Sequence, residues 1–294
     1  MAKMEIIANI TAQETRIALL EDGRLAEFMN ERSSSNDQFL VGNIYAGKVA
    51  NVLPGMDAAF VNIGCEKNAY LYITDVLPVD RAKPIDKILK KDQNVIVQVI
   101  KDTIGTKGMK ITLNTTLPGR YMVLTPHHKQ MHVSKQIEDE REVRRLEAIY
   151  QGIVPANMGV VVRTESEGAT AEDLKHEMQY LMRQWENIQK KFEHGSGPRI
   201  LYKELSLPLA AARDILSDKI SIYLVDSEPV YKELSAFISE VAPALKTRIA
   251  YYDKPTSIFA AFNIEGELSK MRRSRLPLKS GGEIVIQEAE SITM

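Results

Sequence analysis

The feature that most limits the fold of this chain is a long stretch without a helix of ordinary length, from Gly42 to Thr116. Short runs rich in valine and isoleucine alternate there with glycine, proline, asparagine and aspartate. Only residues around 85–90 have a pattern compatible with a short helix. Several short strands separated by regular turn signals are typical of a small barrel or sandwich. The sequence therefore predicts an all-β domain in this stretch.

The segments on either side of this stretch mix strands with helices. Residues 4–32 read as three strands, "EIIANIT", "TRIALLED" and "RLAEFMNE". From about Tyr202 onward helices alternate with strands, and the last helix of the series is "SIFAAFNIEGELSKM". This alternation indicates an α/β arrangement. Because 294 residues suggest two or three domains of roughly 150 residues, we expect an α+β multidomain protein.

Between these regions, an arginine and a hydroxyl follow the end of a strand. The strand Gly159–Val162 is followed directly by Arg163 and Thr164, and then by a Ser/Glu/Gly loop. A guanidinium can contact a phosphate at two points, and a hydroxyl adds a further hydrogen bond. The pair therefore predicts an anion-binding site. The alternative is an ordinary surface ion pair between the arginine and Glu165 or Glu167.

A long helix is predicted after that loop. Thr170 and Asp173 resemble a capping box at its start, with aspartate in place of the usual glutamate. Apolar residues then recur at steps of three and four, which indicates one buried face. This apolar stripe consists of Leu174, Met178, Leu181, Trp185, Ile188 and Phe192. We interpret it as core packing.

The sequence contains no recognisable catalytic motif. There is no H-E-x-x-H, C-x-x-C, G-x-S-x-G or Walker pattern. The histidines of "HHKQMH" lack partner ligands at metal-binding spacing, so we expect a solvated loop. Cys65 is the single cysteine, no apolar run reaches about 18 residues, and no signal peptide is evident. We therefore expect a cytoplasmic protein without a membrane span.

Aromatic residues in the all-β segment suggest a second kind of binding site. Phe60, Tyr70 and Tyr72 lie among glycines and lysines. Aromatic rings on a barrel face, flanked by lysine, suit the stacking of unpaired bases. The alternative is that the rings are buried in the core, and periodicity alone does not decide which way a ring points.

The segment "GNIYAGKVANVLPGMDAAFVNIGCEKNAYLYITDV" (Gly42 to Val76) resembles the RNA-binding OB-fold insert of the ribonuclease E/G family. The similarity continues through "KDQNVIVQVIKD", "GTKGMKITLNTTLPGRYMVL" and "VVVRT". It ends in "RLPLKSGGEIVI", which is similar to the strand that opens the catalytic domain of that family. The resemblance thus extends over essentially the whole chain in collinear order.

The resemblance implies four segments. An RNase H-like domain is expected to be split between residues 1–38 and 203–272. An OB-fold RNA-binding barrel is expected at 39–116, and a 5′-sensor region at 117–202. The start of a DNase I-like catalytic domain is expected at 273–294.

The resemblance also implies two sets of binding residues. The 5′-phosphate set consists of the side chains of Arg163 and Thr164, with backbone groups of Gly119 and Val123. The RNA-binding set on the barrel consists of Phe60, Tyr70 and Lys107. Tyr70 departs from the usual phenylalanine of the family, but it keeps the π-face on which a base stacks.

The activity implied by the resemblance is that of an endoribonuclease. The family cuts single-stranded, A/U-rich RNA, prefers a 5′-monophosphate end, and acts in mRNA decay and rRNA processing. For the full-length enzyme, the resemblance is compatible with assembly into a homo-oligomer. Within this chain, Asn9 takes the place in the first strand where RNase H enzymes hold magnesium with a carboxylate, and a neutral amide is a poor ligand for a hard cation.

We therefore expect this chain to bind RNA without cutting it. The catalytic aspartates of the family, its Mg²⁺ and its Zn²⁺ link are all expected beyond Met294, so no metal or cofactor is expected in this chain. A chain that stops inside a strand pattern is expected to be part of a longer enzyme. The alternative is a complete, non-catalytic RNA-binding regulator that has lost the nuclease domain.

Overall fold

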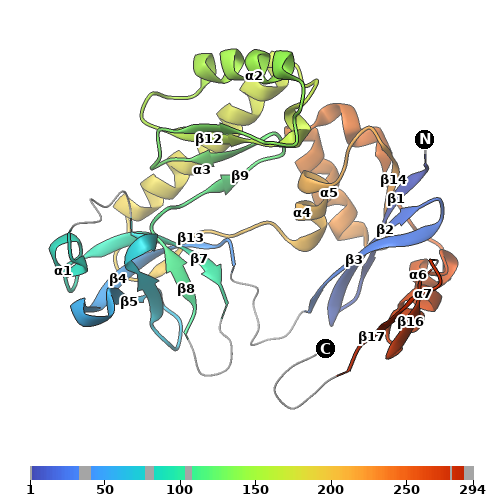
Figure 1. The fold of residues 1–294 in the computed structure, drawn as a ribbon, viewed down its shortest axis with the longest axis horizontal. Coiled ribbons are helices and arrows are strands. Elements are labelled where there is room, and N and C mark those ends of the chain that lie inside the picture. The colour runs from blue at the N-terminus through green and yellow to red at the C-terminus, as the bar shows by residue number, and fades with distance from the viewer. Residues whose placement is uncertain (1, 33–40, 77–82, 103–107, 279, 288–294) are drawn as a thin grey trace. The chain divides into compact units, whose positions relative to one another are not determined.

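The computed structural model of this protein describes residues 2–32, 41–76, 83–102, 108–278 and 280–287. The chain divides into two compact units, one formed by residues 1–37 with 206–294 and the other by residues 38–205 (Figure 1). Both units contain helices and sheets, so the prediction of a mixed helix and sheet protein is confirmed.

The first unit is built on a five-stranded sheet with the order β15-β14-β1-β2-β3. Its strands are β1 (Met4–Ile10), β2 (Glu14–Glu21), β3 (Arg24–Arg32), β14 (Ile220–Val225) and β15 (Ile249–Tyr251). The first three strands are antiparallel neighbours, whereas β1, β14 and β15 run parallel. The three strands predicted for residues 4–32 are therefore present.

Helices pack against this sheet. They are α4 (Leu207–Asp214), α5 (Glu228–Val241), the 3₁₀ segment η4 (Pro243–Arg248), α6 (Ile258–Ala261) and α7 (Ile264–Met271). Ile258, Phe259 and Ile264 of α6 and α7 pack with Ile7 of β1 in one core cluster. A short hairpin of β16 (Arg275–Pro277) and β17 (Glu283–Val285) follows.

The single helix predicted for "SIFAAFNIEGELSKM" is wrong in one respect. The structure divides this segment into α6 and α7, with Asn263 between them at a φ of 54°. Asparagine is one of the few residues that enter the left-handed region at low cost, and this conformation cannot continue a right-handed helix.

The second unit contains a closed five-stranded barrel. The strands are β4 (Ile44–Leu53), β5 (Ala58–Asn62), β6 (Ala69–Tyr72), β7 (Asn94–Lys101) and β8 (Lys110–Thr112). They follow the order β4-β5-β6-β8-β7, and β7 pairs back onto β4 to close the barrel. The 3₁₀ turns η1 (Pro54–Met56) and η2 (Ile73–Asp75) and the short helix α1 (Ile85–Ile88) lie in its connections. The predicted all-β barrel is confirmed as an OB-like arrangement.

The sequence of β4 allows it to bend between its partners. The register with β5 shifts between Val49 and Asn51, which marks a bulge, and bulges increase the local twist and curvature of a strand. At Gly47 an added Cβ would lie 2.6 Å from a methyl carbon of Val61. A larger residue at this position would push β5 away, so glycine permits the close approach that the small barrel needs.

The rest of the second unit is a four-stranded sheet with two helices. The strands are β9 (Leu117–Pro118), β10 (Met122–Thr125), β11 (Met131–Val133) and β12 (Gly159–Val162), in the order β11-β12-β10-β9. The helices are α2 (Glu140–Ile153) and α3 (Ala171–Glu193). After α3, strand β13 (Arg199–Tyr202) pairs with β4 of the barrel (Figure 1).

One hydrophobic core joins this sheet, both helices and the adjoining barrel strands. It includes Leu174, Met178, Leu181, Trp185 and Ile188 of α3, with Phe192 packed at its margin. The predicted apolar stripe is therefore confirmed as core. The capping box of Thr170 and Asp173 is also present, with each side chain bonded to the other residue's backbone N–H. No helix in the described part of the chain is both long and apolar enough to cross a membrane.

Candidate nucleic-acid and phosphate-binding sites

The barrel presents three aromatic rings on its outer face. Along β5 and β6 successive side chains alternate between the two faces of the sheet, and Ala59, Val61, Ala69 and Leu71 form part of the barrel core. Phe60, Tyr70 and Tyr72 occupy the alternate positions and are not part of that core cluster. Tyr72 is 36% exposed, and the other two are half-buried. The rings therefore face outward.

The three rings form a continuous aromatic strip. Phe60 and Tyr70 are cross-strand partners whose rings meet edge to face at 5.9 Å between centroids. Tyr70 and Tyr72 lie nearly parallel, with centroids 6.5 Å apart. Lys110 is paired with Tyr70 in the neighbouring strand, and its ammonium lies 2.7 Å from Asp75. Lys107, the third residue predicted for this surface, lies outside the described residues.

Arg163 lies at the junction of β12 with a short 3₁₀ turn, η3 (Thr164–Ser166). Its backbone N–H donates to the carbonyl of Tyr121 over 2.8 Å, which extends the pairing of β12 with β10 by one residue. Its guanidinium donates to the carbonyl of Gly119 over 2.7 Å. The side chain remains 24% exposed. Both contacts come from the segment between β9 and β10, which therefore holds the arginine at two points.

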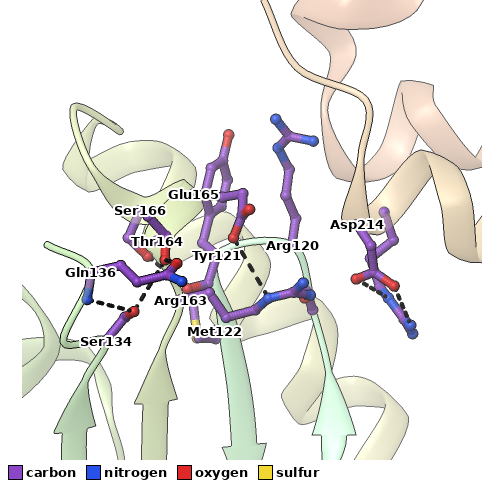
Figure 2. Close-up of polar contacts among 12 residues, drawn as sticks. Arg120, Tyr121, Met122, Ser134, Gln136, Arg163, Thr164, Glu165, Ser166 and Asp214 are labelled. Atoms are coloured by element: carbon purple, nitrogen blue, oxygen red, sulfur yellow. Dashed lines mark hydrogen bonds and ion pairs between the residues drawn. The ribbon is translucent and has the colours of Figure 1, made fainter. Parts of the chain in front are cut away.

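The hydroxyl of Thr164 belongs to a small polar network. It donates to the side-chain oxygen of Gln136 over 2.9 Å and lies 3.1 Å from the hydroxyl of Ser134 (Figure 2). A hydroxyl has one proton to donate, so Ser134 is the donor in the second contact. Sequence reasoning did not find Ser134 or Gln136, because they follow a different strand and no local pattern links them to Thr164.

A carboxylate also approaches the arginine. Glu165 places a carboxylate oxygen 3.7 Å from Nε of Arg163 (Figure 2), so the surface ion pair that was the alternative interpretation is present in part. Exposed pairs of this kind contribute about 0–1 kcal/mol. The hydrogen bond to Gly119 is a full ångström shorter than the contact to Glu165. Of these two contacts, the hydrogen bond to Gly119 is therefore the stronger constraint on the guanidinium.

Helix α2 fastens the loop that follows the phosphate candidates. Glu142 accepts a bond from the backbone N–H of Gly168, and Arg145 donates to the carbonyl of Ala169. The two side chains also form a two-point ion pair at 2.7 Å. The bonds from Arg145 lower the pKa of Glu142 to about 2. These bonds attach the loop after Thr164, at Gly168 and Ala169, to helix α2.

A hydrogen bond or direct adjacency in the chain links three of the four predicted phosphate-site residues. Gly119 bonds to Arg163, and Arg163 is followed by Thr164. Val123 lies in the central strand β10, where it pairs with Val161 on one side and Pro118 on the other.

A buried carboxylate lies directly behind this site. Glu177 of α3 is 2% exposed and accepts hydrogen bonds from the backbone N–H groups of Arg120, Tyr121 and Met122 at 2.6, 2.8 and 3.1 Å. Burial raises the pKa of Glu177 to about 7, although the three amides and Arg120 act in the opposite direction. Sequence reasoning missed this residue. The available signal was a charged residue beside Met178 on the apolar stripe, because a buried charge requires partners.

The described residues do not form a metal site. No group of three or more His, Cys, Asp or Glu side chains suited to a metal is found among them. The prediction that the histidine-containing loop at residues 127–132 is solvated is correct only in part. His127 lies edge-on to Trp185 at 5.2 Å, and burial lowers its pKa.

Asn9 is engaged by protein partners. Its amide nitrogen donates to Asp226 over 2.6 Å, and its oxygen accepts two bonds from Arg16. Both the nitrogen and the oxygen of the Asn9 amide are therefore hydrogen-bonded within the protein. Because the oxygen already accepts from the cationic Arg16, Asn9 does not fit as a ligand of a divalent cation.

The chain is similar in sequence to known ribonucleases. The sequence model of the ribonuclease E/G family matches residues 116–294. Ribonuclease G of Haemophilus influenzae is 35% identical over the whole of this chain, which covers 62% of that relative. Ribonuclease G of Escherichia coli K12 is 34% identical over 98% of this chain and 61% of its own length. Ribonuclease E of Nostoc is 36% identical over 86% of this chain and 38% of its own length. The chain thus spans about three fifths of the ribonuclease G relatives.

Proposed function

The chain belongs to the ribonuclease E/G family, and from that premise we propose that it binds single-stranded RNA and recognises a 5′-monophosphate end. The observation that carries the proposal is the strip of Phe60, Tyr70 and Tyr72 on the outer face of the barrel. Outward rings on a small barrel suit the stacking of unpaired bases, which contributes about 1–3 kcal/mol per base. We also propose that the enzyme to which this chain contributes is an endoribonuclease. Its targets would be A/U-rich single-stranded RNAs in mRNA decay and rRNA processing.

Recognition of the 5′ end is assigned to Arg163 and Thr164. The terminal phosphate would replace Glu165 beside the guanidinium, and the hydroxyl of Thr164 would turn from Gln136 to a phosphate oxygen. Both changes use groups that already lie at the surface around η3. A 5′-hydroxyl end offers no comparable charge, so the site should distinguish the two ends.

For the first unit we propose an RNase H-like fold with a structural role. The sheet order, with three antiparallel strands followed by two parallel ones, supports this assignment. The commitment of Asn9 to Asp226 and Arg16 argues against metal-dependent cleavage at that place. Incubation of the chain with 5′-monophosphorylated single-stranded RNA and Mg²⁺ should leave the RNA intact, and cleavage that persists through repurification would contradict the proposal.

The RNA-binding face is tested by Phe60→Ala. The variant should bind a short A/U-rich oligonucleotide about 5- to 100-fold more weakly, as expected for one lost stacking platform. Tyr251→Ala is the matched control, because Tyr251 is an exposed ring, 41% accessible, outside the barrel. Fluorescence anisotropy with a 3′-labelled RNA measures both. Wild-type affinity in a correctly folded Phe60→Ala protein would refute the assignment.

A further inference from the structure

Glu177 is a charged residue on the buried, otherwise apolar face of α3, and core packing does not explain why a glutamate is found there. It is flanked along the helix by Leu174, Met178 and Leu181, all buried. A carboxylate in such surroundings is costly unless hydrogen bonds compensate for the lost water. Here three consecutive backbone N–H groups of residues 120–122 donate to it, and the charge of Arg120 acts in the same direction. Successive N–H groups that converge in this way form an anion-binding concavity, and the group that fills it is a carboxyl of the protein itself.

The segment held by this carboxylate also positions the phosphate candidates. The carbonyl of Gly119 accepts a bond from the guanidinium of Arg163. The carbonyl of Tyr121 accepts one bond from the backbone of Arg163 and another from the hydroxyl of Ser166. With its N–H groups turned inward to Glu177, the segment thus turns two carbonyls toward Arg163 and the turn η3 that follows it.

Gly119 is fitted to the same carboxylate. A Cβ at this position would lie 2.6 Å from the carboxyl carbon of Glu177 and less than 3 Å from both of its oxygens. No real Cβ is tolerated at such distances, so a side chain at residue 119 would displace the carboxylate or the segment. Gly119 and Glu177 are therefore a matched pair, which accounts for glycine here without any requirement on backbone φ.

We propose that Glu177 is a positioning residue for recognition of the 5′-phosphate, acting through the Gly119–Met122 segment on Arg163. The inference rests on the proposed function of this site and deepens it. Because Glu177 fills the concavity of N–H groups, the RNA phosphate does not bind there, and recognition is left to the side chains of Arg163 and Thr164. Supporting groups of this kind hold a binding residue to within a fraction of an ångström.

The test compares Glu177→Gln and Glu177→Leu with Glu186→Gln, an exposed glutamate on the same helix. Each variant is titrated with one oligonucleotide carrying either a 5′-monophosphate or a 5′-hydroxyl. Glutamine keeps the volume and one acceptor oxygen, whereas leucine keeps only the volume. We expect the ratio of the two affinities to fall by at least about threefold in Glu177→Gln and to approach one in Glu177→Leu, because misplacing a binding group weakens its contact steeply. The 5′-hydroxyl affinity should stay within about twofold of wild type, since the aromatic strip is untouched.

The outcomes separate the two ideas. A merely structural role for Glu177 would weaken both RNAs alike and leave their ratio unchanged. A wild-type ratio in both Glu177 variants, with a clear preference in the wild-type protein, overturns the positioning role and leaves the proposed function intact. Equal affinity of the wild-type protein for both RNAs overturns the proposed 5′-end recognition, and the positioning role falls with it. If Glu177→Leu does not fold, Glu177→Gln alone decides.

Discussion

Glu177 should make the stability of the second unit fall as the pH rises from 5 to 8. Burial raises the pKa of this carboxyl to about 7 from its ordinary value of 4.5. Between those two values the folded chain holds a proton that the unfolded chain releases. The stabilisation is therefore complete below about pH 4.5 and is lost as the pH rises through 7. At roughly 1.4 kcal/mol per pH unit, the loss amounts to about 3 kcal/mol.

The assay uses the only tryptophan of the chain. Trp185 lies on the same helix as Glu177 and is 3% exposed in the core of the second unit. Its fluorescence during urea unfolding therefore follows this core. The wild-type protein is compared with Glu177→Gln at pH 5 and pH 8. His127, whose lowered pKa makes stability fall below pH 6.5, is present in both proteins and cancels in the difference.

We expect the free energy of unfolding of the wild-type protein, relative to Glu177→Gln, to decrease by about 3 kcal/mol from pH 5 to pH 8. The direction follows from burial outweighing the three amide bonds. The reasoning is refuted if both proteins respond to pH in the same way, or if the wild-type protein gains stability over the variant as the pH rises.

Three further changes have defined outcomes. Glu165→Gln removes the carboxylate 3.7 Å from Arg163 and should strengthen binding of 5′-monophosphate RNA roughly two- to fivefold in anisotropy titrations at low salt; unchanged binding would mean that the two charges do not compete. Thr164→Val keeps the side-chain shape but removes the hydroxyl, and should weaken binding of the same RNA roughly two- to tenfold without affecting 5′-hydroxyl RNA. Arg16→Ala removes both donors to the amide oxygen of Asn9 and should destabilise the first unit by about 1–3 kcal/mol, measured by hydrogen exchange; wild-type protection would show that the network contributes nothing.

The parts of the fold that the sequence predicts well are those determined by local patterns. The apolar stripe and capping box of α3 depend on residues three or four apart, and the structure contains both. The all-β barrel likewise follows from strand and turn signals. The break at Asn263 was not predicted, because the residues on both sides favour a helix and the left-handed φ of one asparagine divides them.

The candidate sites show where sequence reasoning ends. The pairing of Arg163 with Thr164 is visible in the chain, but their partners are not. Gly119 is 44 residues from Arg163, and Gln136 is 28 residues from Thr164. The direction of the ring of Phe60 depends on which face of β5 is buried, and the barrel closure determines this. Such non-local contacts follow from topology and leave no local pattern.

The central claim is tested most directly by the affinity of the wild-type chain for two RNAs that differ only at the 5′ end. The same A/U-rich oligonucleotide, with a 5′-monophosphate or a 5′-hydroxyl, is titrated at low salt, and the titrations are repeated with Arg163→Ala and Arg163→Lys. A charge-assisted hydrogen bond contributes about 1.5–3 kcal/mol, and the site is partly exposed, so the account predicts a preference of about tenfold or less for the monophosphate. Arg163→Ala should abolish the preference, and Arg163→Lys should retain only part of it, because an ammonium lacks the planar two-point contact. Equal affinity of the wild-type chain for both RNAs would contradict the account.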